Sequence, residues 1–203
     1  ISQLAKFKQM KTLLRILVVE DSEDDTLLVM RQIKKGGYNV EHERVETAEK
    51  MNDALRDKAW DIILSDYHLP HFNGLEALTL SKESGIDIPF IIISGTIGEE
   101  TAVEAMKAGA HDYIMINNIH RLVPAIEREL REWKNRAERK LLEWKQIQAE
   151  ALRVSEEKYR YIFDNISDGI FLLEVTEDYR FRNLEMNSSL VNLTGIDRNY
   201  MIG

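Results

Sequence analysis

Three short apolar runs in the first half of the chain each end on polar side chains that could handle a metal ion or a phosphoryl group. The runs are Ile16–Asp21, Asp61–Asp66 and Phe90–Gly95. The polar side chains at their ends are Glu20, Asp21, Asp66 and Ser94. Each run is rich in Val, Ile and Leu without polar alternation, which is typical of a strand buried on both faces of a parallel sheet. Ligands of such sheets bind beyond the carboxyl ends of the strands, so we expect the four side chains to converge on one crevice.

Three carboxylates in one crevice repel one another, which raises their pKa values unless a cation is present. Mg²⁺ suits such a site because it prefers oxygen ligands, keeps several waters and bridges to phosphate oxygens. With the metal bound, one carboxylate could attack phosphorus while the metal and nearby donors stabilise the equatorial oxygens. Ser94, which is followed by the small Gly95, could donate a hydrogen bond to one of these oxygens.

Each of these residues also has a structural interpretation. Acidic residues around Asp21 could simply stabilise a helix N-terminus through the helix dipole. Asp66 could have the purely structural role of beginning a turn. The coincidence of all four positions with the ends of buried strands favours a functional site instead. His68 and His71 could ligate a transition metal, but loop histidines are usually solvent-exposed. Tyr113, in the last expected strand, is more often a core residue than part of a switch.

The elements that would position this crevice alternate from residue 15 to about residue 120. Further strands are expected at Val40–Val45 and Asp112–Ile116, which makes five with the three runs above. Helices between them follow capping residues and stop at glycines, for example at Gly36 and at Gly109. Five β-α units predict an α/β fold with a doubly wound, mostly parallel sheet.

After Pro124 the pattern changes to that of a long helix. Between Ala125 and Phe163 there is no Gly or Pro, and apolar residues alternate steps of three and four, with Lys140 and Lys158 as exceptions. This spacing over about five heptads predicts a coiled coil. We therefore expect a parallel homodimer through residues 126–161. Acidic and basic residues are balanced along the helix, which indicates a solvated face rather than a stripe that binds nucleic acid.

The composition sets wider bounds. The 203 residues suffice for one large or two modest domains, and 44% hydrophobic residues support a packed core. No apolar stretch reaches the roughly 18–20 residues that span a membrane, and no secretory signal is evident. Cysteine is absent, which excludes disulfides, and the net charge of -8 disfavours nucleic acid as a partner. A cytoplasmic location is the expectation.

Residues 15 to about 131 resemble the receiver domain of bacterial and archaeal response regulators. The residues that carry the resemblance are Glu20, Asp21, Asp66, Pro70, Gly74, Ser94, Tyr113 and the stretch GAHDYIMI at Gly109–Ile116. The resemblance implies a five-stranded parallel sheet in the flavodoxin-like order 2-1-3-4-5. It also implies that Asp66 accepts a phosphoryl group from a histidine kinase or a small phosphodonor. Glu20, Asp21, Asp66 and the backbone carbonyl of His68 would hold Mg²⁺, while Ser94 and Tyr113 would shift together to signal phosphorylation.

One position departs from this family. Three residues after the switch aromatic, the family carries a lysine that pairs with the phosphoryl group, and here that position is Ile116. Isoleucine offers neither a positive charge nor a hydrogen bond. We therefore expect Mg²⁺ binding to survive and phosphotransfer to be weakened.

The end of the chain is similar to the opening half of a PAS sensor domain. The similarity covers Glu156–Val175, Asn187 and Leu193–Gly203, with strands expected at Gly169–Val175 and Tyr179–Met186. This stretch has no His or Cys, so attachment of haem or flavin cannot be read from it. A partial α+β PAS fragment would therefore follow the long helix.

The expected organisation has four parts. They are an N-terminal extension at residues 1–14, a receiver domain at 15–124, a coiled-coil connector at 125–160 and a truncated PAS domain at 161–203, whose capping segment begins near residue 155. Such an order resembles the front end of sensor histidine kinases and, less often, of diguanylate cyclases. We therefore expect a Mg²⁺-dependent phosphoacceptor that regulates a dimeric helical linker and an output module, rather than a stand-alone enzyme.

Two other functions fit parts of this pattern less well. Ile116 would also suit a phosphorylation-independent pseudo-receiver that acts as a protein-interaction scaffold. An aspartyl phosphatase is disfavoured because such enzymes usually carry a second acid two residues after the nucleophile, where this chain has His68.

Overall fold

The computed structural model describes residues 12–95 and 98–196. The chain divides into two compact units, Ile1–Glu138 and Arg139–Gly203. Most of the expected N-terminal extension and the last seven residues of the expected PAS fragment lie outside the described residues. Within the described part of the chain, no helix combines the length and apolar character needed to cross a membrane.

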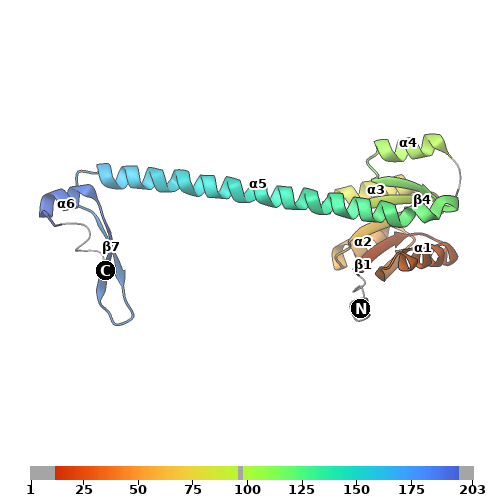
Figure 1. Cartoon of the computed structure of the whole chain (residues 1–203), viewed down its shortest axis with the longest axis horizontal. Helices are drawn as coiled ribbons and strands as arrows, with labels where there is room; N and C mark the ends of the chain where they lie inside the picture. Colours follow the sequence, from red (N-terminus) through yellow and green to blue (C-terminus); the bar gives the residue numbers. More distant parts are fainter. Residues whose placement is uncertain (1–11, 96–97, 197–203) are drawn as a thin grey trace, which may run out of the picture. The chain divides into compact units, whose positions relative to one another are not determined.

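The first unit is built on a five-stranded parallel sheet in the order β2-β1-β3-β4-β5 (Figure 1). The strands are β1 (Leu13–Val19), β2 (Asn39–Val45), β3 (Ile62–Asp66), β4 (Phe90–Ser94) and β5 (Asp112–Met115). The helices that alternate with them are α1 (Glu23–Lys35), α2 (Ala48–Asp57), α3 (Gly74–Glu83) and α4 (Glu99–Lys107). This topology confirms the predicted sheet and its strand order. Strand β1 begins at Leu13, earlier than expected, and Ile116 follows β5 as the first residue of a 3₁₀ turn, η1 (Ile116–Arg121).

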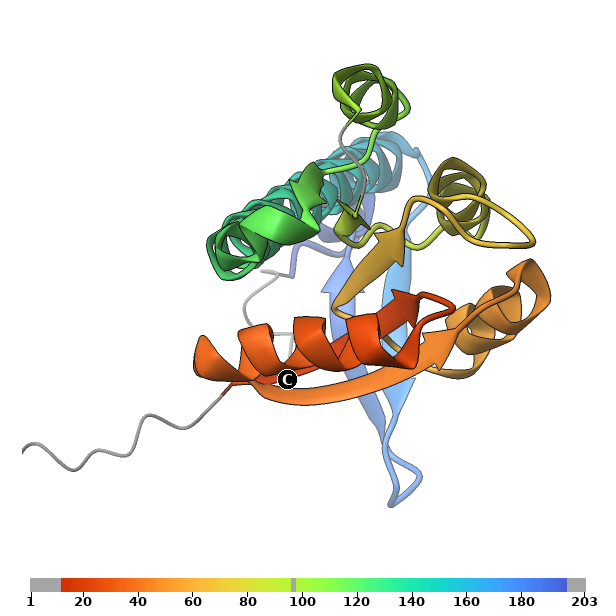
Figure 2. The same ribbon diagram turned by 90° about the vertical axis from the view of Figure 1, so that its right-hand side faces the viewer.

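The sheet has a core on each face because successive side chains of a strand point to opposite sides. Ile16 and Val18 of β1 belong to the core that α1 and the start of α5 (Leu122–Asn165) cover. Leu17 and Val19 belong to the other core, which α2, α3 and α4 cover. Figure 2 shows α1 and α5 on one side of the sheet and α2 and α3 on the other. Burial on both faces explains why these strands contain continuous apolar runs.

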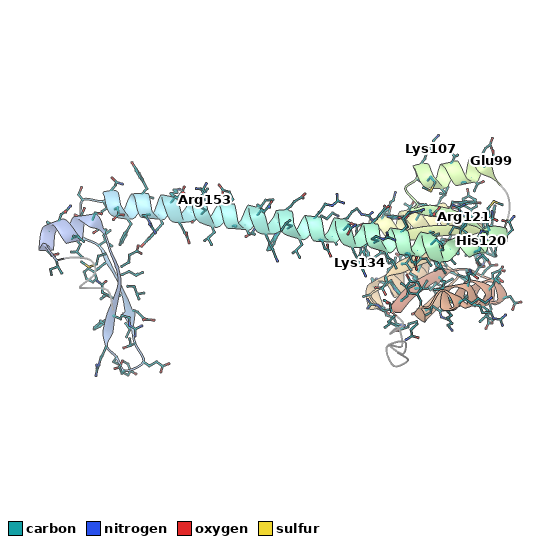
Figure 3. All side chains as sticks on the ribbon, in the orientation of Figure 1. Glu99, Lys107, His120, Arg121, Lys134 and Arg153 are labelled. Carbon is teal, nitrogen blue, oxygen red and sulfur yellow. The ribbon has the colours of Figure 1, made fainter. Side chains whose placement is uncertain are left out.

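Local signals fix where the helices begin. The Ser22 hydroxyl accepts a hydrogen bond from Asp25 N–H at 3.2 Å, and Thr47 caps α2 in the same way. Helix α4 carries Glu99 at its first residue and Lys107 at its last, the charge order that complements the helix dipole (Figure 3).

Helix α5 is a single helix of 44 residues. Its first turns bury Leu122, Ala125 and Ile126 against the sheet. The expected boundary between receiver and connector at residue 124 therefore falls inside a helix. Further along, the predicted heptad residues Trp144 and Ile147 are 59% and 65% exposed in this single chain. In a coiled coil a second helix would cover these apolar side chains. The structure contains a single chain, so the coiled coil stays a prediction.

The second unit contains the end of α5 and three elements after it. They are β6 (Phe171–Val175), β7 (Phe181–Met186) and α6 (Ser188–Thr194). Strands β6 and β7 pair antiparallel, so the two predicted strands are present. Asn187 joins the elements, because its buried amide accepts hydrogen bonds from Ile170 N–H and Leu190 N–H and donates to the Asp168 carbonyl.

Candidate functional site

Three of the four predicted side chains form one cluster at the carboxyl end of the sheet. Glu20, Asp21 and Asp66 each offer a carboxylate oxygen, and these three oxygens lie within 4.8 Å of one another. Glu20 and Asp66 are half-buried, whereas Asp21 is exposed. Residues separated by 45 positions in the sequence therefore share one small negatively charged site.

The sheet itself brings the acids together. Asp66 is the last residue of β3, and Glu20 follows β1, which pairs with β3 through the register Val19↔Ser65. The Glu20 N–H donates to the Val45 carbonyl of β2 at 2.9 Å, so the chain stays attached to the sheet for one residue beyond β1.

Asp66 is oriented by the loop that follows it. Its Oδ2 accepts a hydrogen bond from the His68 N–H at 3.2 Å. Gly74, the first residue of α3, lies against the same loop, and a Cβ there would come within 2.8 Å of the Asp66 carbonyl oxygen. Only a residue without a side chain fits this position without displacing the backbone of Asp66.

Without a cation, the carboxylates of the cluster repel one another and their charged forms are disfavoured. Burial raises the pKa of Glu20 to about 7, and the nearby Asp66 and Asp21 carboxyls act in the same direction, against the hydrogen bond from Ser22 N–H. Burial also raises the pKa of Asp66, although backbone hydrogen bonds from Tyr67 and His68 oppose the shift. A divalent cation would remove this repulsion.

The three carboxylates fit a magnesium ion. Mg²⁺ binds oxygen at about 2.1 Å, so two opposite ligands of an octahedral site lie about 4.2 Å apart. The observed limit of 4.8 Å is close to this value. The exposed Asp21 can make the remaining adjustment by a rotamer change, because it is the least buried of the three.

A cavity of about 200 Å³ lies beside the carboxylates. Its polar residues include Glu20, Asp66 and His68, and its apolar wall includes Ile93 and Ile116. Among the described residues that line it there is no Lys or Arg. Ile116, which stands where the receiver family carries a lysine, therefore puts a branched apolar side chain in the wall of the acidic site.

The structure places the two predicted switch residues on neighbouring strands of the sheet. Ser94 ends β4, the strand next to β3, and is 1% exposed, while its neighbours Ile93 and Gly95 line the cavity. Tyr113 on β5 pairs in register with Ile92 and packs beside the core that α2, α3 and α4 cover. Tyr113 is not among the residues that line the cavity.

One contact at the site was missed by the sequence analysis. The Arg44 guanidinium on β2 donates to the carbonyl oxygens of Glu20 and Asp21 at 2.9 and 3.1 Å. A single arginine at the end of a strand gives no signal of its own, because the contact depends on β2 lying beside β1.

Comparison with known proteins gives a consistent family. The family described as response regulator receiver domain matches residues 16–126, more than half of the chain. The transcriptional regulatory protein ZraR of Salmonella typhimurium is 35% identical over 103 residues, which cover 49% of this chain and 22% of that protein. The cell cycle transcriptional regulator CtrA of Caulobacter vibrioides is 29% identical over 118 residues, which cover 54% of this chain and 50% of that protein. The chain therefore spans half or less of the length of these relatives.

A solved structure also matches the first unit. The CheY-like response regulator receiver domain protein from Methanospirillum hungatei is 28% identical, with a TM-score of 0.52, and the match covers 62% of this chain and 99% of that one. The matched protein is a receiver domain almost throughout, and the match includes well over half of this chain.

Proposed function

Because this chain belongs to the response regulator receiver domain family, we propose that its first unit accepts a phosphoryl group on Asp66 in a Mg²⁺-dependent reaction. The observation that carries the proposal is the cluster of Glu20, Asp21 and Asp66, with carboxylate oxygens within 4.8 Å of one another. A histidine kinase or a small phosphodonor such as an acyl phosphate would supply the phosphoryl group, and the reaction would take place in the cytoplasm.

In this reaction a carboxylate oxygen of Asp66 forms a bond to phosphorus. The bond from phosphorus to the nitrogen or oxygen of the donor breaks, and its electron pair leaves with the donor. The His68 N–H fixes the plane of the nucleophile through its hydrogen bond to Oδ2. Ser94 would supply a hydroxyl donor for a phosphoryl oxygen.

Glu20, Asp21, Asp66 and the backbone carbonyl of His68 would hold the magnesium ion, which when bound neutralises the carboxylates and the charge that develops on the phosphoryl oxygens. Burial and mutual repulsion raise the pKa values of Glu20 and Asp66 in the absence of the ion. The protein therefore holds two half-buried acids in an arrangement that a cation stabilises.

Ile116 sets the efficiency of the reaction. It occupies the cavity wall beside Asp66, where a lysine side chain would place a positive charge. Without that charge, phosphotransfer is slower and the phosphorylated site is coupled less strongly to Tyr113. This feature also supports the second candidate function, a phosphorylation-independent receiver that serves as a protein-interaction scaffold.

The rest of the chain would carry the output. We place the receiver at residues 15–124, the connector at 125–160 and a partial PAS domain at 161–203, with Tyr113 as the switch aromatic. The exposed apolar residues of α5, including Trp144 and Ile147, support a parallel homodimer through residues 126–161. Arg153 supports a solvated opposite face, because it pairs with Glu150 and Glu157 of its own helix (Figure 3). The whole protein would then be a sensor histidine kinase, or less often a diguanylate cyclase, although ZraR and CtrA are transcriptional regulators.

Mass spectrometry after incubation with acetyl phosphate and Mg²⁺ tests the proposal. The unchanged protein should gain one phosphoryl group, slowly, and Asp66→Asn should gain none. Omission of Mg²⁺ should abolish labelling of the unchanged protein. Labelling of the Asp66→Asn variant would show that another residue is the acceptor. Tight Mg²⁺ binding with no labelling at all would favour the scaffold.

A further inference from the structure

Arg44 makes a contact that is not part of the backbone hydrogen bonding of the sheet and does not involve the carboxylates that would bind a metal. Its Nη1 donates to two successive carbonyl oxygens, those of Glu20 at 2.9 Å and Asp21 at 3.1 Å. The contact joins β2, at the edge of the sheet, to the segment that leaves β1. Glu46 lies 3.7 Å from the same guanidinium nitrogen and limits how far the Arg44 side chain can turn away.

The segment that Arg44 holds carries two of the three clustered acids. Within it, the Glu20 N–H is tied to Val45, and the Glu20 carboxylate accepts a hydrogen bond from Ser22 N–H at 2.9 Å. Asp21 is exposed, and the contact with Arg44 fixes its carbonyl. A fixed carbonyl at Asp21 limits the rotation of the peptide that precedes Ser22, and with it the direction of the Asp21 side chain.

Arg44 binds the backbone of the acids and leaves their carboxylates free. A guanidinium beside carboxylates would ordinarily pair with them and compete with a cation. Here both hydrogen bonds go to carbonyl oxygens, while the carboxylate oxygens of Glu20, Asp21 and Asp66 face one another. The arrangement orders the loop without occupying its ligand atoms.

We propose that Arg44 is a positioning residue, which holds the backbone of Glu20 and Asp21 in the conformation that lets both carboxylates reach one Mg²⁺ ion. The inference rests on the magnesium site of the proposed function. Partners outside the ligand set of a metal site commonly contribute about 10- to 100-fold to metal affinity.

Charge and positioning predict opposite effects of removing Arg44. A positive charge near a cation site repels the cation, so on charge alone the Arg44→Gln variant should bind Mg²⁺ more tightly. If Arg44 positions the acids, the same variant should bind Mg²⁺ at least about tenfold more weakly. The sign of the change therefore separates the two roles.

The experiment is a Mg²⁺ titration of the full chain, followed by calorimetry and, independently, by competition with Mn²⁺ in electron paramagnetic resonance. Arg15→Gln is the matched control, because it also removes one arginine from the sheet. Arg15 lies near the start of β1, at the opposite end from the acids, where it pairs with Asp61 at 3.0 Å. Thermal unfolding without Mg²⁺ checks that each variant is folded.

We expect Arg44→Gln to weaken Mg²⁺ binding at least about tenfold, Arg44→Lys to weaken it less, and Arg15→Gln to leave it unchanged. Unchanged or tighter binding by Arg44→Gln overturns the inference and leaves the magnesium site intact. If Arg44→Gln does not fold, Arg44→Lys decides, and its binding Mg²⁺ as the unchanged protein does would overturn the inference. Absence of saturable binding in the unchanged protein would instead refute the magnesium site, and the role of Arg44 with it.

Discussion

Replacement of Gly74 by alanine should both destabilise the first unit and disturb Asp66, the proposed phosphoacceptor. The added Cβ would lie 2.8 Å from the Asp66 carbonyl oxygen and 3.1 Å from the Tyr67 Cα. Both are backbone atoms, so no side-chain rotation relieves the overlap. Alanine gains up to about 1 kcal/mol over glycine in a helix, but overpacking costs about 1–3 kcal/mol. Because both neighbours are backbone atoms, we take the overpacking cost near the upper end of its range, about 2–3 kcal/mol, and expect a net loss of about 1–2 kcal/mol.

Gly95→Ala is the matched control because Gly95 lines the same cavity. Among the residues that the structure describes, a Cβ at Gly95 would meet a single neighbour, the Ile116 Cγ2 at 4.0 Å, which is an ordinary van der Waals contact. Its stability should change by less than about 0.5 kcal/mol. Urea denaturation followed by tryptophan fluorescence measures both variants, since Trp60 is buried in the first unit. Equal stability of the two variants would refute the steric reasoning. Unchanged Mg²⁺ affinity in a destabilised Gly74→Ala would refute the predicted disturbance of Asp66.

Three further predictions test other parts of the chain. Ile116→Lys should speed labelling by acetyl phosphate, because an ammonium group in the cavity wall would stabilise the phosphoryl oxygens. Unchanged labelling in mass spectrometry would show that a charge at residue 116 does not act on the proposed acceptor. Ile147→Asp should dissociate the proposed dimer in sedimentation, because it puts a charge in the predicted heptad seam, and an unchanged mass would reject that seam. His111 should make stability fall as the pH drops below its unfolded pKa of about 6.5. The ring nitrogen Nδ1 accepts from Phe90 N–H at 3.1 Å, and burial, opposed in part by the nearby Glu129, lowers the pKa of His111, so the unfolded chain binds the proton first. The other charged groups near the ring are Lys82, Asp87 and Arg136. His111→Asn should remove this pH dependence from urea denaturation curves, and a slope that persists would assign it to another group.

The strands could be predicted because their burial is written directly into the sequence. Ile63 and Ile92 are fully buried, and so are their neighbours in the strand, so the apolar runs are continuous. The start of β1 escaped prediction for a physical reason. Arg15 interrupts the apolar run, and in the folded chain its charge is paired with Asp61, with Oδ1 at 3.0 Å from Nη2. A pairing across 46 residues leaves no trace in a local pattern.

The clustered acids and Arg44 differ in whether a local sequence pattern could predict them. The acids could be predicted from sequence because the ends of parallel strands meet at one edge whatever the details of packing. Arg44 could not, because its role depends on the register of β2 against β1, in which Arg44 pairs with Val18. Shifting that register by one residue would turn the guanidinium to the other face of the sheet.

Little positive charge lies beside the clustered acids, and this should affect how phosphorylation depends on Mg²⁺. Arg44 is engaged with carbonyl oxygens, and Ile116 provides no charge in the cavity wall. A phosphoryl group on Asp66 would replace the single charge of its carboxylate by about two negative charges, in a site that already holds Glu20 and Asp21. Among the described residues of the cavity, only His68 could carry a positive charge. The bound cation would then supply most of the compensation, so phosphorylation in this chain should depend more steeply on Mg²⁺ concentration than in the Ile116→Lys variant.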